Sequence, residues 1–297
     1  MAKRKVVKKH DAHREAPIPK GWLLAVGGSE DKGKRELKEE QEKNIGFIHE
    51  EILKRFVKEL RGENPLIAIV PTGSTMPEEL AKEYIEVFQE LGLKNLEVID
   101  VRNRQDARNE DYCKILERAA GIMFTGGDQL RLTSILGGTP VLELMKERYT
   151  HEEIIVAGTS AGATAMSTPM IYEGETQGGY IKGDVRITTG LEFLKNVAID
   201  THFIARGRIV RMAQAISTNP GCIGVGLEED TAILVTEGKE VEVLGSGLVT
   251  IVDGLDISYT NIYEIKTGEP FTVCDMKVHL LSRGQRYTLP FYDQLHI

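Results

Sequence analysis

One serine stands in a setting that suits nucleophilic catalysis, within the run Ala157–Met166, AGTSAGATAM. An apolar run precedes this segment, and its G-x-S-x-G pattern is typical of a nucleophile elbow, in which a strand turns sharply into a helix and exposes the serine hydroxyl. A side chain at Gly158 or Gly162 would collide with the neighbouring backbone. The amide of Ala161 starts the expected helix without an intrahelical partner, so it suits a developing oxyanion. An ordinary glycine turn fits the five-residue pattern too, but the strand before it and the helix after it favour a nucleophile at Ser160.

A serine nucleophile needs a base, and the base needs an acceptor that fixes its tautomer. Of the seven histidines, His202 alone follows a buried-looking strand, Ala198–Asp200, and so reaches the same sheet edge as the serine. A structural role is the alternative for this histidine. The other histidines lie in the N-terminal tail, in or beside charged helical segments, or near the C-terminus: His10, His13, His49, His151, His279 and His296.

The elements that must position these residues alternate between short apolar strands and amphipathic helices. The predicted strands are 22–26, 66–70, 95–100, 121–125, 154–156, 198–200, 223–227, 231–236, 241–244 and 249–252, and the predicted helices are 34–60, 77–91, 105–120, 130–136, 141–148 and 208–218. This order predicts an α/β fold with a mostly parallel sheet covered on both faces, in one three-layer domain over residues 21–297. Ligands bind at the carboxyl ends of such strands.

Composition and charge narrow the function further. Of 297 residues 41% are hydrophobic, which is ample for a large core. No apolar run has the length of a membrane span and the start lacks a secretory signal, so we expect a cytoplasmic protein. Three widely separated cysteines indicate neither disulfides nor a zinc site. The net charge is −8 although residues 1–20 are basic; we expect a solvated, disordered tail and an acidic body that does not bind nucleic acid as its main task.

Four ordered motifs resemble the cyanophycinases and their relatives. They are GTSAGA around Ser160, FTGGDQ ending at Gln129, DTHFIARGRIVR ending at Arg211 and GLEEDTAI ending at Ile233. The resemblance runs from about residue 26 to residue 235. It implies a serine peptidase with the class I glutamine-amidotransferase-like (flavodoxin-like) fold shared with the aspartyl dipeptidase peptidase E, without a cofactor or metal, and a homodimer.

Carried over by position, the resemblance makes Ser160 the nucleophile and His202 the general base and then general acid. It places the orienting acid shortly after the elbow; we choose Glu175, with Glu173 as the second choice. Gly127 would supply the second oxyanion amide beside Ala161.

The implied substrate is cyanophycin, a poly-aspartate with arginine on each side-chain carboxyl, from which the family releases β-Asp-Arg dipeptides. The carboxylates of this polymer can be bound by the planar guanidinium groups of arginine side chains. The residues expected to bind substrate are Gln129, Asp200, Thr201, Arg206, Arg208 and Arg211. Glu229 and Asp230 suit a substrate guanidinium, or form an acidic turn between two strands. Thr201 departs from the glutamine of cyanophycinases, which leaves the chemistry intact and the substrate open.

Four other functions are alternatives to this one. An α-aspartyl or isoaspartyl dipeptidase of the peptidase E type would use the same residues with a different pocket. A glutamine amidotransferase ordinarily uses cysteine at the elbow, and an α/β-hydrolase esterase usually carries its histidine much further along the chain. A catalytically idle module that binds an acidic or arginine-containing peptide would keep the pocket without reacting at Ser160.

Overall fold

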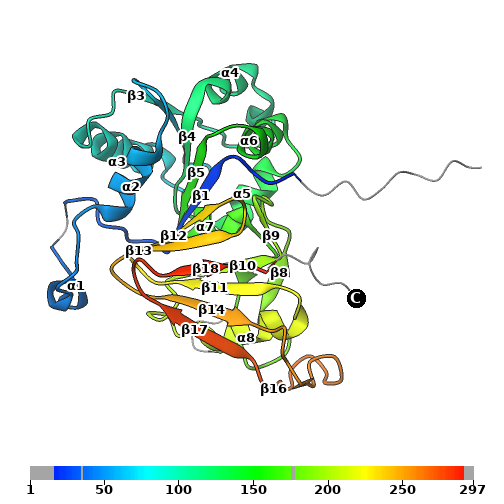
Figure 1. The fold of residues 1–297 in the computed structure, drawn as a ribbon. Helices are drawn as coiled ribbons and strands as arrows, with labels where there is room; N and C mark the ends of the chain where they lie inside the picture. Colours follow the sequence, from blue (N-terminus) through cyan, green and yellow to red (C-terminus); the bar gives the residue numbers. More distant parts are fainter. Residues whose placement is uncertain (1–16, 35, 175–177, 291–297) are drawn as a thin grey trace, which may run out of the picture.

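A computed structural model describes residues 17–34, 36–174 and 178–290, and its central element is an eight-stranded sheet (Figure 1). The strand order is β18-β13-β12-β1-β5-β4-β2-β3. Five neighbours run parallel: β1 (Trp22–Val26), β5 (Ile155–Thr159), β4 (Ala119–Phe124), β2 (Leu66–Val70) and β3 (Asn95–Val98). The antiparallel strands β12 (Thr231–Thr236), β13 (Glu240–Gly245) and β18 (Arg286–Thr288) extend it beyond β1. Every residue of β2 and β5 is buried, as expected of parallel strands covered on both faces.

Helices cover both faces of this sheet. On one face α2 (Glu51–Glu59) and α3 (Pro77–Glu90) pack Phe56, Tyr84 and Phe88 against alternate residues of β1 and β2. On the other face lie α4 (Glu110–Arg118), α5 (Gln129–Leu136), α6 (Pro140–His151) and α7 (Ala161–Met166). The predicted α/β class with a mostly parallel central sheet is therefore confirmed.

A second sheet, which the sequence pattern did not separate from the first, lies beside it in Figure 1. Its order is β17-β14-β11-β10-β6-β9, with bounds Lys277–Leu281, Val249–Asp253, Ile223–Leu227, Val197–Thr201, Ser167–Thr168 and Leu194–Lys195. Only β10 and β11 at its centre, and β6 with β9, are parallel among its pairs. Residues of β10, β11 and β14 share one apolar core with β1 and β5, while α8 (Ile209–Thr218) covers the opposite face. Two small sheets pair β7 (Met170–Glu173) with β8 (Arg186–Thr188) and β15 (Tyr259–Thr260) with β16 (Val273–Cys274).

Two predicted helices are interrupted. The segment predicted as one helix over 34–60 forms α1 (Glu39–Lys43) and α2, because Asn44 accepts a hydrogen bond from Gly46 N in a turn and Glu50 takes a left-handed φ of 55°. The segment 105–120 forms a 3₁₀ turn, Asp106–Arg108, and then α4, whose N-cap Asn109 accepts from Asp111 N. Most of the predicted basic tail, residues 1–16, lies outside the described residues.

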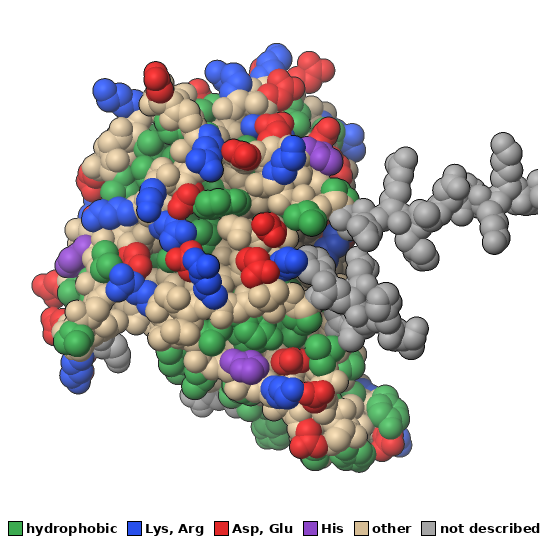
Figure 2. All heavy atoms as spheres, in the orientation of Figure 1, with side chains coloured by type: hydrophobic (Ala, Val, Ile, Leu, Met, Phe, Trp, Pro, Cys, Tyr) green, Lys and Arg blue, Asp and Glu red, His purple; other side chains and the backbone are tan. Residues whose placement is uncertain are grey.

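Both signs of charge are interspersed over the face drawn in Figure 2, with the densest mixture over the upper part that holds α2, α3 and α4. No helix in the described part of the chain has the length and apolarity needed to cross a bilayer.

Candidate active site

Ser160 stands at the turn between β5 and α7 with φ 51° and ψ −114°, a conformation that few residues other than glycine adopt. Its amide donates to Val26 O of β1 at 2.9 Å, which ties the turn to the neighbouring strand. The flanking glycines are needed: a Cβ on Gly158 would lie 2.7 Å from the backbone of Gly162, and one on Gly162 would lie 2.7 Å from Phe124 O. The local structure is therefore the strained elbow that the sequence predicts.

A buried carboxylate lies beneath the elbow. Glu30, in the loop after β1, accepts a hydrogen bond from Thr159 Oγ1 at 2.6 Å and another from Tyr84 OH, and its Oε1 lies 3.4 Å from Lys32 Nζ. Burial raises the pKa of Glu30, but the charge of Lys32 and these hydrogen bonds outweigh burial and leave the pKa below its ordinary value. The ionised carboxylate thus links the residue before Ser160 to α3.

His202 follows β10 and faces the serine. Its Nε2 lies 3.1 Å from Ser160 Oγ, within hydrogen-bond reach. The left-handed φ of 50° at His202 and the bond from its amide to Gly27 O at 3.2 Å fix the turn that aims the ring. Gly28 packs against the same ring, since a Cβ there would lie 2.7 Å from His202 Nε2. The loop after β1 therefore touches both the serine and the histidine.

The acid beside the histidine is Glu229, which sequence reasoning did not choose for this role. Glu229 Oε1 lies 2.7 Å from His202 Nδ1. Glu175, our choice, falls outside the described residues. The second choice, Glu173, lies at the exposed end of β7 and pairs with Arg186 at 3.2 Å. In the described chain, the carboxylate at His202 Nδ1 is Glu229, for which the sequence left open a substrate guanidinium partner or an acidic turn.

The electrostatics of this contact set the histidine tautomer. Burial raises the pKa of Glu229, but hydrogen bonds from Lys38 and His202 outweigh burial and leave the pKa below its ordinary value. An ionised carboxylate only accepts hydrogen bonds, so Nδ1 carries the proton and donates to Glu229. Nε2 is then free to accept the proton of Ser160. This arrangement matches the division of roles in a serine–histidine–acid triad.

The glycine turn after β4 lies beside the serine. A Cβ on Gly126 would lie 3.7 Å from Ser160 Cβ. Gly127 has a φ of 141°, and a Cβ there would lie 2.2 Å from Gly73 O, so this position requires glycine. Ala161 is the first residue of α7. The two residues expected to form the oxyanion hole thus lie on the two segments that adjoin Ser160.

Three of the expected substrate-binding residues contact one another. Asp200 is fully buried at the end of β10 and receives Arg208 Nη1 at 2.9 Å and Arg211 Nε at 2.6 Å. Arg211 also donates to Gly174 O at 3.2 Å. Asp200 therefore takes up much of the hydrogen-bonding capacity of both guanidinium groups, which reduces what they offer to a substrate carboxylate.

The remaining three lie in different settings. Gln129 opens α5 and donates to Ile171 O of β7 at 3.2 Å. Thr201 is buried, and its carbonyl accepts from Arg208 at 2.6 Å. Arg206 is exposed on the turn after His202. Of the expected arginines, Arg206 is therefore the one whose side chain is exposed to a large substrate.

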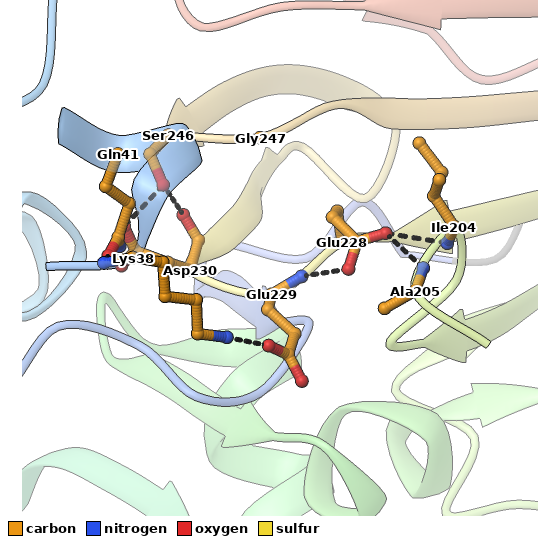
Figure 3. A pocket seen from close by; sticks show the side chains of 9 residues that line it. All are labelled: Lys38, Gln41, Ile204, Ala205, Glu228, Glu229, Asp230, Ser246 and Gly247. Carbon is orange, nitrogen blue, oxygen red and sulfur yellow. Dashed lines mark hydrogen bonds and ion pairs between the residues drawn. The ribbon is translucent and has the colours of Figure 1, made fainter. Parts of the chain in front are cut away.

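A cavity of about 380 Å³ adjoins Glu229 (Figure 3). The cavity is lined by carboxylates of the turn between β11 and β12 and by the turn after His202. The segment that begins α1 and the turn between β13 and β14 complete the lining. The lining residues are Lys38, Gln41, Ile204, Ala205, Glu228, Glu229, Asp230, Ser246 and Gly247. Lys38 points at the second oxygen of Glu229. Among the described residues, no three His, Cys, Asp or Glu side chains are grouped to hold a metal ion.

The signal that identifies Glu229 is the pairing of two parallel strands. In the register of β10 with β11, Thr201 stands opposite Leu227. The next residues of both strands therefore emerge at one edge, which brings the acidic turn after Leu227 beside His202. The sequence contains both strands, but their adjacency follows only from the sheet order.

Comparisons with known proteins identify the family of this chain. Residues 40–243 match peptidase family S51. The chain is 36% identical over 266 residues to a cyanophycinase of Geminocystis herdmanii, covering 89% of this chain and 92% of that one. It is 33% identical over 292 residues to a cyanophycinase of Synechococcus elongatus, covering 98% and 84%. The structure of a peptidase from an acI-B1 actinobacterium shares the fold, with a TM-score of 0.61 at 20% identity over 92% of this chain and 98% of that one. The chain therefore belongs to peptidase family S51.

Proposed function

We propose that this protein is a cyanophycin-degrading serine exopeptidase that releases β-Asp-Arg dipeptides through an acyl-enzyme. The observation that carries the proposal is the chain of contacts from Ser160 Oγ to His202 Nε2 at 3.1 Å and from His202 Nδ1 to Glu229 at 2.7 Å. The match to cyanophycinases over most of both chains supports the substrate.

The reaction follows from the contacts. Ser160 Oγ attacks the scissile carbonyl while His202 Nε2 takes its proton, and Glu229 stabilises the imidazolium that forms. The amides of Gly127 and Ala161 stabilise the negative oxygen of the tetrahedral intermediate. Nε2 then protonates the leaving amine, which breaks the C–N bond and leaves an ester on Ser160. A water molecule, deprotonated by His202, hydrolyses that ester and regenerates the serine.

Substrate recognition is part of the same proposal. Arg206, exposed beside the catalytic turn, is proposed to bind a carboxylate of the polymer. Arg208 and Arg211 bind Asp200 and form part of the wall of the site. These two guanidinium groups and one carboxylate together carry a net charge of +1. Gln129 and Thr201 complete the proposed set of substrate contacts.

Incubation of the purified protein with insoluble cyanophycin tests the function directly. We expect clearing of the suspension and soluble β-Asp-Arg by mass spectrometry, and no product from Ser160→Ala, since loss of the nucleophile removes the covalent route and several orders of magnitude in turnover. Hydrolysis of α-Asp-X dipeptides in place of the polymer would favour the peptidase E type. Failure of a fluorophosphonate to label Ser160 would favour an idle binding module.

Assembly and location complete the proposal: a homodimer in the cytoplasm. The resemblance to cyanophycinases supports the dimer, and sedimentation velocity at micromolar concentration measures it. A monomer under those conditions would remove the dimer and leave the triad chemistry in place.

A further inference from the structure

The carboxylate of Glu229 is shared between two partners that are far apart in sequence. One oxygen accepts from His202 Nδ1, and the other accepts from Lys38 Nζ, which reaches it from the segment before α1 (Figure 3). The Lys38 side chain is 51% exposed, so its ammonium keeps part of its hydration while it contacts the carboxylate. The chemistry at Ser160 does not itself require a cation at this position.

The segment that carries Lys38, residues 36–50, is tied down near Glu229 at several points. Gln41 Nε2 donates to Asp230 Oδ2 at 2.9 Å, and Asn44 Nδ2 donates to Ser246 O at 3.2 Å. Arg283 Nη1 donates to the carbonyl of Gly46 at 2.7 Å. At its end, Asp31 accepts from the amide of Glu50 at 3.0 Å and lies 3.2 Å from His49 Nδ1. The chain that follows Lys38 is therefore held close to Glu229 by the fold.

The two residues that flank Glu229 in its turn are also acidic. Its neighbours in the turn are Glu228, whose carboxylate accepts from the amides of Ile204 and Ala205, and Asp230, which accepts from Ser246 Oγ at 2.6 Å. Other charged or titratable groups on the elements packed around the histidine and this turn include Glu30, Asp31, Lys32, His49, Asp200, Arg206, Arg208 and Arg211. Lys32 is paired with Glu30, and Arg208 shares the single negative charge of Asp200 with Arg211. Lys38 contacts the acid of the proposed triad directly.

We propose that Lys38 is a positioning residue of the active site, which holds the second oxygen of Glu229 and limits the negative charge that acts on His202. This proposal rests on the triad proposed above. Because Lys38 binds its second oxygen, the Glu229 carboxylate is kept from rotating away from the imidazole of His202. The positive charge of Lys38 also offsets part of the negative charge that Glu229 presents to His202.

The effect has a defined sign and size. The contacts put Lys38 Nζ about 6 Å from the imidazole, and at that separation a unit charge in a half-hydrated setting shifts a protonation equilibrium by about half to one pH unit. Lys38→Met removes the charge and keeps the chain length, so the acidic limb of the activity profile should move to higher pH by that amount. Lys38→Arg keeps the charge and should restore the limb. Simple loss of structure would lower the rate at every pH instead.

The test measures the second-order rate of fluorophosphonate labelling of Ser160 between about pH 5 and pH 9, which needs the triad but not cyanophycin. Wild type, Lys38→Met and Lys38→Arg are compared with Lys43→Met, which removes a lysine from α1 that pairs with Glu39. We expect the limb to move in Lys38→Met alone. If the acidic limb of the pH profile lies at the same pH in Lys38→Met and in wild type, the proposal is overturned. Absence of labelling in wild type would refute the triad and, with it, the role of Lys38.

Discussion

Replacement of Glu229 by glutamine isolates the charge of the acid, because the amide retains the shape of the carboxylate beside His202. In wild type the contact of 2.7 Å puts the centres of opposite charge about 4 Å apart once the imidazolium forms. At an effective dielectric constant of about 20 that pair contributes about 4 kcal/mol, which corresponds to about a thousandfold in rate. Lys38 and the partial exposure of Glu229 reduce this figure, so we expect a loss of 10²- to 10³-fold in kcat.

The assay is the rate of β-Asp-Arg release from cyanophycin, with the rate of fluorophosphonate labelling of Ser160 as a substrate-independent second measurement. Glu173→Gln removes the same charge from an exposed residue of β7 and should change either rate by less than about twofold. Glu175→Gln, at the acid that the resemblance predicts, serves as the competing variant. The reasoning is refuted if Glu229→Gln stays within about tenfold of wild type while Glu175→Gln or Glu173→Gln loses a thousandfold. Circular dichroism and the melting temperature of each variant check that the fold is retained.

Three further variants test the support around the site. Gly28→Ala places a Cβ 2.7 Å from the ring of His202 at a backbone φ of 99°, so we expect at least a tenfold loss of kcat and a lower melting temperature. Asp200→Asn leaves two buried guanidinium groups without their counter-charge and should lower the free energy of unfolding in urea by about 3–5 kcal/mol; a change below about 1 kcal/mol would contradict that account. Glu242→Gln breaks a bidentate pair with Arg55, at 2.9 and 3.1 Å, whose hydrogen bonds lower the pKa of Glu242. A carboxylate whose pKa is lowered in the folded state stabilises the fold above its ordinary pKa of 4.5, and this stabilisation is lost as the pH falls through the folded-state pKa. The variant should therefore be less stable than wild type by about 1 kcal/mol at pH 7 and equally stable near pH 3, as measured by urea denaturation.

Local sequence signals predicted the elbow and the longer buried strands, β1 to β5 and β10 to β14, because these depend on neighbouring residues, whereas the short strands β6 to β9 and the strands β15 to β18 were not predicted. Strand β1 has the predicted bounds Trp22–Val26, since an apolar run followed by two glycines has few other solutions. The prediction of one long helix over 34–60 was wrong. It followed the spacing of the apolar residues, whereas the turn formed by Asn44 and Gly46 ends α1. In that segment Gln41 and Asn44 bind Asp230 and Ser246, and Lys38 contacts Glu229, a residue 191 positions away.

The choice of acid shows the limit of reading along the chain. The resemblance placed the acid shortly after the elbow, at residue 175 or 173, whereas the contact of Glu229 with His202 depends on which strand pairs with β10. That pairing belongs to a second sheet whose strands come from before and after α8, and no local pattern specifies it.

By itself, the sequence determined the residue types that chemistry requires: a serine on a glycine-flanked turn, one histidine after a buried strand and acidic residues after another. Periodicity and glycine placement encode these features within about ten residues. The tertiary structure alone decided which carboxylate meets the histidine, that Asp200 pairs with Arg208 and Arg211, and that Lys38 reaches the other side of Glu229. These contacts depend on sheet order and register, which minimise the free energy of the whole core and are not set by any single segment.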